Sequence, residues 1–432
     1  MSPGGVLFAG FILFIAGGVP IPFALLLSSL IVFLMNPATP AWVVAQRAVS
    51  GIDSFVLVAI PFFILAGNIM NAGGITERLL KLAMALVGHI RGGLSHVTVV
   101  VGMFFAGISG SSVAECAALS TLFIPSMIKK GYRTDFAVSI TACASTMGVI
   151  IPPSILMVIY GAVANTSIGA LLIGGAVPGV LIGLALIAEG YVIALRHGYP
   201  PEVDRWLGLR ALLKGFGEAI LPLGVPFIIV GGILSGYFTP TESAVVATLY
   251  AMLITMVVYR TVGWRDLPRL FGEAGLLTAL IYIMVAAATV FAWLLAFYRI
   301  PDAITEVFLS FTKQPVLILL SVLALFTFLG TFMDATPAIL IFVPIVQPIA
   351  VGAGIHPVHL GVIVVMTMAF GLLTLPYGLC SLIACGVAKV PVRKILLMLH
   401  LIMLAEFIII VLCCLFPDIV LFLPRLLAPQ WL

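Results

Sequence analysis

Apolar runs follow one another along the whole chain, separated by short polar stretches. Many are near the length of about 20 residues that a helix, at 1.5 Å rise per residue, needs to cross a bilayer. The runs expected to be ordinary membrane segments are Val6 to Met35, interrupted at GGVPIP, then Phe55 to Met70, Ile168 to Leu195, Phe216 to Leu234, Ser243 to Tyr259, Ala274 to Phe297 and Ile395 to Phe416. The pattern predicts an all-α polytopic membrane protein.

Two clusters of small polar residues interrupt this pattern, at Ser109 to Ser112 and at Ser145 to Gly148. Irregular backbone at membrane depth is tolerated only where it is buried in protein or lines a polar cavity. The arms around the first cluster, Leu94 to Ala106 and Val113 to Ile128, are short for a full crossing and predict a re-entrant hairpin. The second cluster, continuing into GVIIPP, predicts a broken helix.

The same framework recurs 223 residues later. The matching pairs are Gly107 and Gly330, Pro125 and Pro348, Gly131 and Gly354, Gly148 and Gly371, and Pro153 and Pro376. The second hairpin turns at GTFMDATP and the second break reads GLLTLPYG. The sequence therefore predicts two repeats, each a hairpin followed by a broken helix, as in paired-repeat transporters.

Basic residues predict that the repeats are inverted. The first hairpin ends at the basic KKGYR (Lys129, Lys130, Arg133), whereas the second ends at the neutral GAGIHP. Beyond the breaks the bias reverses, with ANTSIG in the first repeat and AKVPVRK in the second. By the positive-inside rule, the first hairpin should open to the cytoplasm and the second to the outside. Their tips should then meet near the midplane.

These elements divide the chain into scaffold and transport parts. We expect residues 1–70 to be N-terminal scaffold, 75–170 the first repeat, 171–300 central scaffold with a polar linker at 196–214, 301–394 the second repeat, and 395–432 a C-terminal span.

The tips and breaks offer the chemistry of a cation site. Unwound membrane helices free carbonyl oxygens that, with a Ser or Thr hydroxyl, coordinate sodium without burying a full charge. We expect sodium ligands among Gly107, Ser109, Thr146, Gly148 and Ile151 in the first repeat, and Gly330, Met333, Gly371, Thr374 and Tyr377 in the second. We expect substrate contacts from Ser111, Ser112, Ser145, Asp334 and Thr336. Close packing of small residues is the alternative interpretation of both clusters, and the recurrence at one offset favours a site.

The few intramembrane charges have competing interpretations. Asp334 is either a functional carboxylate or the N-cap of a helix, and Glu115 is either functional or a cap. Glu242 in TPTES is expected to be an N-terminal helix carboxylate. Arg47 and Arg299 either meet an anionic substrate or anchor the chain at the interface.

Composition excludes other classes of protein. The 432 residues are 63% hydrophobic and 8% charged, which leaves no room for a soluble domain. The net charge of +4 is explained by cytoplasmic loops, so it does not indicate nucleic acid. The six cysteines have no metal or redox spacing, and no nucleotide-binding, hydrolase or zinc signature occurs. The first apolar run lacks a cleavage site and is expected to be retained.

Several motifs together resemble one transporter family over nearly the whole chain. They are IPFFILAGNIM, GISGSSVAECAAL, TMGVIIPPSILMVIYG, GYFTPTESAVVA and GTFMDATPAILIFVPIVQPIAVGAGIHPVHLG. The chain resembles the large membrane subunit of tripartite ATP-independent periplasmic (TRAP) transporters. The resemblance implies an elevator-type secondary transporter of the bacterial inner membrane, driven by sodium (Na⁺). It also implies two partners, a periplasmic substrate-binding protein and a small four-helix membrane subunit that we expect to be a separate chain.

The resemblance also implies sodium sites at Gly107, Ser109 and Gly148, and at Gly330, Gly371 and Thr374. One segment departs from the family, which commonly has Thr-Pro-Pro-Val-Gly-x-Asn at the second break. This chain reads TLPYGLC, with Leu375, Tyr377 and Cys380 in place of a Pro, an apolar residue and an Asn. A side-chain role for that Asn is therefore lost here.

We expect sodium-coupled uptake of a carboxylate solute, such as a C4-dicarboxylate, another organic acid or a sialic acid. The alternative is a stand-alone ion-coupled exchanger or antiporter that needs no binding protein. A channel would need a continuous polar path, and a membrane enzyme would need paired carboxylates or a His cluster. The sequence has neither feature.

Overall fold

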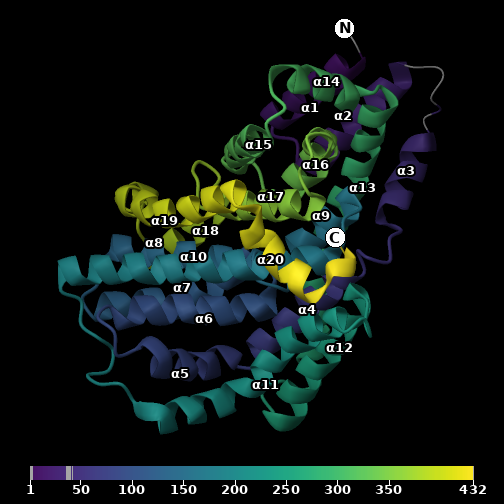
Figure 1. The fold of residues 1–432 in the computed structure, drawn as a ribbon. Helices are drawn as coiled ribbons and strands as arrows, with labels where there is room; N and C mark the ends of the chain where they lie inside the picture. The colour runs from purple at the N-terminus through teal and green to yellow at the C-terminus, as the bar shows by residue number, and fades with distance from the viewer. Residues whose placement is uncertain (1–2, 36–39, 41, 432) are drawn as a thin grey trace.

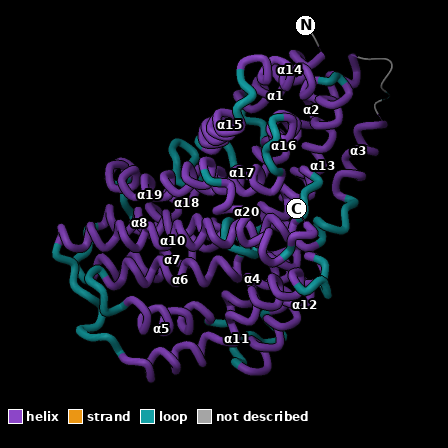
Figure 2. The backbone as a smooth tube through the Cα atoms, in the orientation of Figure 1, coloured by secondary structure: helices purple, strands orange, loops and turns teal. Residues whose placement is uncertain are grey.

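The computed structural model describes residues 3–35, 40 and 42–431, with no side chains described at 308, 309 and 311. Within these ranges the chain consists of helices and loops, without a strand (Figure 2). The predicted connector from Asn36 to Arg47 lies partly outside the described residues, and a helix already begins at Trp42.

The helices follow the apolar runs closely. They are α1 Pro3–Ala16, α2 Ile21–Met35, α3 Trp42–Ile52, α4 Ala59–Ala72, α5 Ile75–Val87, α6 Gly93–Ser109, α7 Ser112–Lys129, α8 Thr134–Ser145, α9 Ile155–Ala164, α10 Ile168–His197, α11 Gly208–Leu234, α12 Pro240–Met252, α13 Leu267–Phe297, α14 Ile300–Phe311, α15 Pro315–Gly330, α16 Ala335–Gly352, α17 Pro357–Gly371, α18 Leu379–Ala388, α19 Leu396–Leu415 and α20 Pro417–Leu427. Short 3-10 segments are η1 Thr146–Val149, η3 Val392–Lys394 and η4 Pro429–Trp431, and η2 Leu253–Val258 is a π-helix.

Six helices among the described residues are long and apolar enough to cross a membrane. They are α10, α11, α12 with η2, α13, α16 and α19, and α4 with α5, bent by 74°, would make a seventh. The prediction of an all-α polytopic membrane protein is confirmed.

The polar linker is shorter than the predicted 196–214. Helix α10 continues to His197 and ends where Gly198 adopts a positive φ of 69°, and α11 begins at Gly208. Leu209, Leu212 and Leu213 recur at helical spacing, so the second half of the predicted linker forms the first turns of α11.

The hairpin arms are longer than predicted because the polar residues at the tips are mostly helical. Helices α6 and α7 have 17 and 18 residues, and only Gly110 and Ser111 separate them. Gly110 has a φ of 63°, which favours glycine and ends α6. In the second hairpin, Thr331 to Asp334 separate α15 from α16.

The helix bounds follow the 223-residue offset. Helix α7 spans 112–129 and α16 spans 335–352, so both ends differ by 223. Helices α8 and α17 begin at 134 and 357, which is the same difference. The breaks lie at 146–154 and 372–378, and the Pro152–Pro153 and Leu375–Pro376 peptide bonds are both cis.

The two hairpin and broken-helix units pack against each other. Helix α7 contacts α18, and α16 contacts α9, so each hairpin touches the second half-helix of the other unit. Gln347 donates from Nε2 to the Ala164 carbonyl at 2.7 Å, and the Cys116 thiol donates to the Cys380 carbonyl at 3.1 Å. In Figure 1, α6, α7 and α10 run side by side below α17 and α18. Helices α2, α3, α4 and α12 form another group that packs around α13 or on each other.

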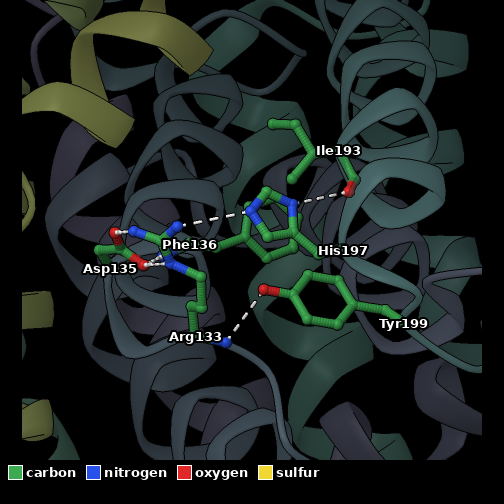
Figure 3. Close-up of polar contacts among 6 residues, drawn as sticks. All are labelled: Arg133, Asp135, Phe136, Ile193, His197 and Tyr199. Carbon is green, nitrogen blue, oxygen red and sulfur yellow. Dashed lines mark hydrogen bonds and ion pairs between the residues drawn. The ribbon is translucent and has the colours of Figure 1, made fainter.

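The end of α10 and the residues after it contact the loop between α7 and α8 (Figure 3). The Arg133 backbone N–H donates to the Tyr199 hydroxyl at 3.1 Å, and its guanidinium pairs with Asp135 and contacts His197. Tyr199 stacks on Tyr132 with ring centroids 4.3 Å apart. The start of α8 and the end of α10 are therefore held together at the basic mouth of the hairpin.

We expect Tyr199→Ala to destabilise the protein by about 3 kcal/mol, because Tyr199 is 5% exposed and its ring supports three aromatic neighbours. Tyr199→Phe keeps the stack and loses one hydrogen bond, so it should cost about 1 kcal/mol. Thermal unfolding in detergent measures both. Equal losses of stability in the two variants would show that ring stacking does not stabilise the contact between the end of α10 and the start of α8.

Two glycines let α15 and α17 touch backbone to backbone. A Cβ on Gly330 would lie 2.6 Å from the Gly371 Cα, a distance that real side chains do not adopt. The second tip thus rests directly on the second break.

We expect Gly330→Ala to cost about 1–3 kcal/mol, because one of the two helices must shift. Gly386→Ala on α18 is the control, since a Cβ there meets no atom within 4 Å and alanine favours a helix by up to about 1 kcal/mol. Melting temperatures of the purified variants measure the contrast. A Gly330→Ala variant as stable as Gly386→Ala would contradict the close contact.

Candidate ion and substrate site

A cavity of about 500 Å³ lies where the two tips and the two breaks meet. The tips contribute Ser109 to Ala114 with Ala117, and Asp334 to Thr336; the breaks and the half-helices after them contribute Val149, Ile155, Leu156, Leu372 and Leu379; and Phe105 lies on α6. Helices α4 and α13 complete the lining with Ile64, Gly67, Asn68, Asn71, Leu277, Leu280 and Ile281. The cavity therefore lies between the hairpin units and the α13 group of helices.

The first tip rests on the first break. The Ser112 hydroxyl donates to the Thr146 carbonyl at 3.1 Å, and the Ile155 N–H donates to the Gly110 carbonyl at 3.3 Å. A Cβ on Gly148 would lie 3.1 Å from the Ser112 Cα, so this glycine also permits a close approach. Backbone oxygens of both segments are concentrated here.

The second tip and break are joined in a similar way. The Tyr377 N–H donates to the Thr331 carbonyl at 3.0 Å. The Thr374 hydroxyl donates to the Gly371 carbonyl at 2.8 Å, at the point where Gly330 and Gly371 touch. The structure thus brings Gly330, Gly371 and Thr374 together.

The predicted site residues fall into two layers. Ser109, Ser111, Ser112, Asp334 and Thr336 line the cavity. The other ten do not line it: Gly107, Ser145, Thr146, Gly148, Ile151, Gly330, Met333, Gly371, Thr374 and Tyr377. This second layer suits ions held behind the substrate better than contacts with the substrate itself.

Three residues of the second layer have neighbours that the sequence did not reveal. Ser145, expected at the substrate, is fully buried and its hydroxyl donates to the Ala142 carbonyl at 2.7 Å. Gly107 faces Pro226 of α11, and Ile151 packs against Gly179 of α10. Neither Ser145 nor Ile151 is brought to the cavity.

Asn68 and Asn71 are the polar lining residues that the sequence did not single out. They lie one turn apart on α4 and line the cavity beside the first tip. The stretch GNIMN carried a signal, because two amides at a spacing of three in an apolar helix mark one polar face. The lining residues of α13 are apolar and gave no signal.

The cavity has an unusual charge balance for an anion site. Among the described lining residues there is no Lys, Arg or His, and Asp334 is the single carboxylate. Asp334 occupies the N-cap position of α16 but makes no side-chain cap bond. Ser111 is the N-cap of α7, so two helices begin at the cavity and direct their partial positive charge toward it.

The remaining charged candidates lie outside the cavity lining. Glu242 accepts from the Thr239 N–H and hydroxyl, both at 2.8 Å, in a capping box, which confirms its expected place at a helix N-terminus. Arg47 stacks over the Trp293 ring with its guanidinium carbon 5.3 Å from the centroid. Arg299 does not line the cavity either.

Comparison with known proteins agrees with this architecture. The family model "Tripartite ATP-independent periplasmic transporter, DctM component" matches residues 8–419. The sialic acid TRAP transporter large permease protein of Vibrio cholerae is 39% identical over 98% of this chain and 96% of its own length. The C4-dicarboxylate TRAP transporter large permease protein of the same species is 37% identical over 88% of each chain.

A solved structure shows the same fold at much lower identity. The YdaH transporter of Alcanivorax borkumensis aligns with a TM-score of 0.62 and 13% identity over 88% of this chain and 89% of its own. The chain belongs to the family of TRAP transporter large permease proteins, and it is a transport protein of the bacterial inner membrane, not an enzyme.

Proposed function

We propose that this protein takes up a carboxylate solute by sodium symport, after a periplasmic binding protein delivers the solute to it. A small four-helix membrane subunit is its partner in the bilayer. The relatives named for sialic acid and for C4-dicarboxylate support these two classes of acid as the candidate substrates.

The observation that carries this proposal is the single cavity between two tip and break pairs. An anionic solute in this cavity meets Asp334 and no basic side chain among the described lining residues. Helix N-termini offset part of that cost, about 0.3–1 kcal/mol each. Full compensation needs cations bound nearby, so uptake of an anion should require co-bound sodium.

The second layer behind the cavity supplies suitable sodium ligands. The first pair offers Thr146, Gly148 and the neighbouring backbone, together with Ser109 of the cavity lining, and the second offers Gly330, Met333, Gly371, Thr374 and Tyr377. Oxygen atoms of carbonyls and hydroxyls bind sodium, and unwound helices supply them at membrane depth. The glycines allow the tip and break backbones to approach each other closely at both pairs.

An elevator movement fits the packing. The hairpins and broken helices contact each other through α7 with α18 and α16 with α9, and can therefore move as one body. The cavity lies at the border of this body, against α4 and α13. Sliding along that wall would carry the solute and its ions across the membrane together.

A stand-alone exchanger remains the second candidate, and dependence on a binding protein separates the two. Uptake of radiolabelled sialic acid or a C4-dicarboxylate is measured in proteoliposomes that contain this chain and its small subunit. We expect uptake only with both the cognate binding protein and an inward sodium gradient. Uptake that ignores the binding protein would support the exchanger, and uptake with potassium in place of sodium would contradict sodium coupling.

We expect Thr374→Ala to raise the sodium concentration for half-maximal uptake about tenfold, equivalent to about 1.4 kcal/mol, by removing one oxygen ligand. Thr121→Ala is the matched control, because this exposed α7 hydroxyl bonds only to carbonyls of its own helix. Sodium titrations of uptake measure both. An unchanged sodium dependence in Thr374→Ala would show that Thr374 is not a ligand of a sodium ion at the second tip and break pair.

A further inference from the structure

Glu115 is a buried carboxylate without a partner. Its side chain is fully buried, and neither carboxylate oxygen has a hydrogen-bond partner. It does not cap α7, because Ser111 is the N-cap and accepts from the Ala114 N–H. The capping interpretation of Glu115 is therefore wrong, and the helix dipole at the first turn of α7 offsets only about 0.3–1 kcal/mol of the cost of burying its charge.

Two glycines leave space for the Glu115 carboxylate. A Cβ on Gly148 would lie 2.5 Å from Oε2, and a Cβ on Gly102 would lie 3.0 Å from Oε1. The carboxylate therefore lies between α6 and the η1 turn of the first break. Any larger residue at Gly148 would displace it.

The surroundings supply no positive side chain. The ion pairs of the described residues lie elsewhere, and the Cys116 and Cys380 thiols are the titratable neighbours of Glu115. A second fully buried carboxylate without a partner, Glu406 of α19, lies near Thr146 of the same turn. An uncompensated buried charge costs several kcal/mol, so each of these carboxyl groups is neutralised either by a proton or by a bound cation.

Oxygen atoms suitable for a cation converge on the same turn. The Ser112 hydroxyl and the Thr146 carbonyl are 3.1 Å apart, and the Ser111 carbonyl carbon would lie 3.1 Å from a Cβ on Gly148. The Glu115 carboxylate and the backbone of the first tip therefore both lie against Gly148 of the first break. A hard monovalent cation prefers this set of ligands.

The second tip and break pair has no counterpart to Glu115. The position 223 residues later is Ala338, which is fully buried on α16. The second tip has its carboxylate at Asp334 instead, where it lines the cavity. The two pairs therefore differ in where their negative charge lies: behind the cavity in the first and at its wall in the second.

We propose that Glu115 is a direct carboxylate ligand of the cation at the first tip and break pair, and that it makes this the tighter of the two sodium sites. This proposal rests on the sodium coupling proposed above. The first ion then stays bound through the cycle more firmly than the second, and it fixes the first tip onto its break before the solute arrives.

Thermal unfolding of the purified complex with its small subunit, titrated with sodium chloride against a choline chloride background, tests this proposal without transport. We expect wild type to gain stability in two phases of sodium concentration. Glu115→Gln, which is isosteric, should lose the tighter phase or move it to at least about tenfold higher sodium. In choline it should be as stable as wild type or more stable, because an uncompensated charge is gone. Glu115→Asp should give an intermediate shift.

Two comparisons make the result decisive. Glu189→Gln on α10 removes a carboxylate that also has a buried oxygen without a partner but lies outside the tips and breaks, so its sodium titration should match wild type. In a Thr374→Ala background, Glu115→Gln should remove most of the remaining sodium stabilisation.

A failure of sodium coupling and a failure of the proposed role of Glu115 give different results. A wild type that sodium does not stabilise at all would overturn sodium coupling and this proposal together. A Glu115→Gln variant with the wild-type titration, or one that loses stability equally in sodium and choline, would overturn only the role of Glu115.

Discussion

The structure depends on how irregular backbone is satisfied inside a membrane. A tip or a break leaves N–H and carbonyl groups without helical partners, and lipid cannot supply them. Here each tip bonds to the break of its own unit, through Ser112 and Thr146 in the first and Thr331 and Tyr377 in the second. Neither segment could exist alone at membrane depth. The pairing of tip with break is thus a requirement of folding before it is a feature of transport.

The same constraint bears on the proposed binding of ions and solute at one location. Because each tip meets its break, backbone carbonyl groups of the two segments lie close together, and residues of both tips and both breaks line one cavity. The glycines at Gly148 and at Gly330 with Gly371 allow the backbones to approach closely enough for this. A larger residue would separate the segments, and both the backbone pairing and the ligand set would be lost.

The sequence predicted the helices well, because apolar length and proline or glycine breaks are local signals. It also predicted that each tip meets its own break, near Gly107 and Gly148 in the first repeat and near Gly330 and Gly371 in the second. Each cluster of small residues alone is a weak signal, and their recurrence at one offset makes the signal strong. It could not decide how far each arm stays helical. Gly107 and Ser109 are small residues at the tip and yet helical, since they are buried in protein and not exposed to lipid.

The sequence also could not separate the lining of the cavity from the layer behind it. Ser145 and Ser112 look alike in sequence, but one donates to its own helix and the other reaches across to the break. The spacing of Asn68 and Asn71 marked one polar face of α4, but only the fold shows that this face lines the cavity. Such assignments depend on tertiary packing, which no periodicity contains.

The positions of the two carboxylates bear on the order in which ions and solute would bind. The first unit has its carboxylate in the protein interior at Glu115, and the second has one at the cavity wall at Asp334. An interior carboxylate attracts a cation whether or not solute is present, because its burial is costly at all times. A cavity carboxylate repels an anionic solute until a cation neutralises it. Under the sodium coupling and the Glu115 role proposed above, the order of binding is a first ion at the first tip, a second ion beside the cavity, and then the solute.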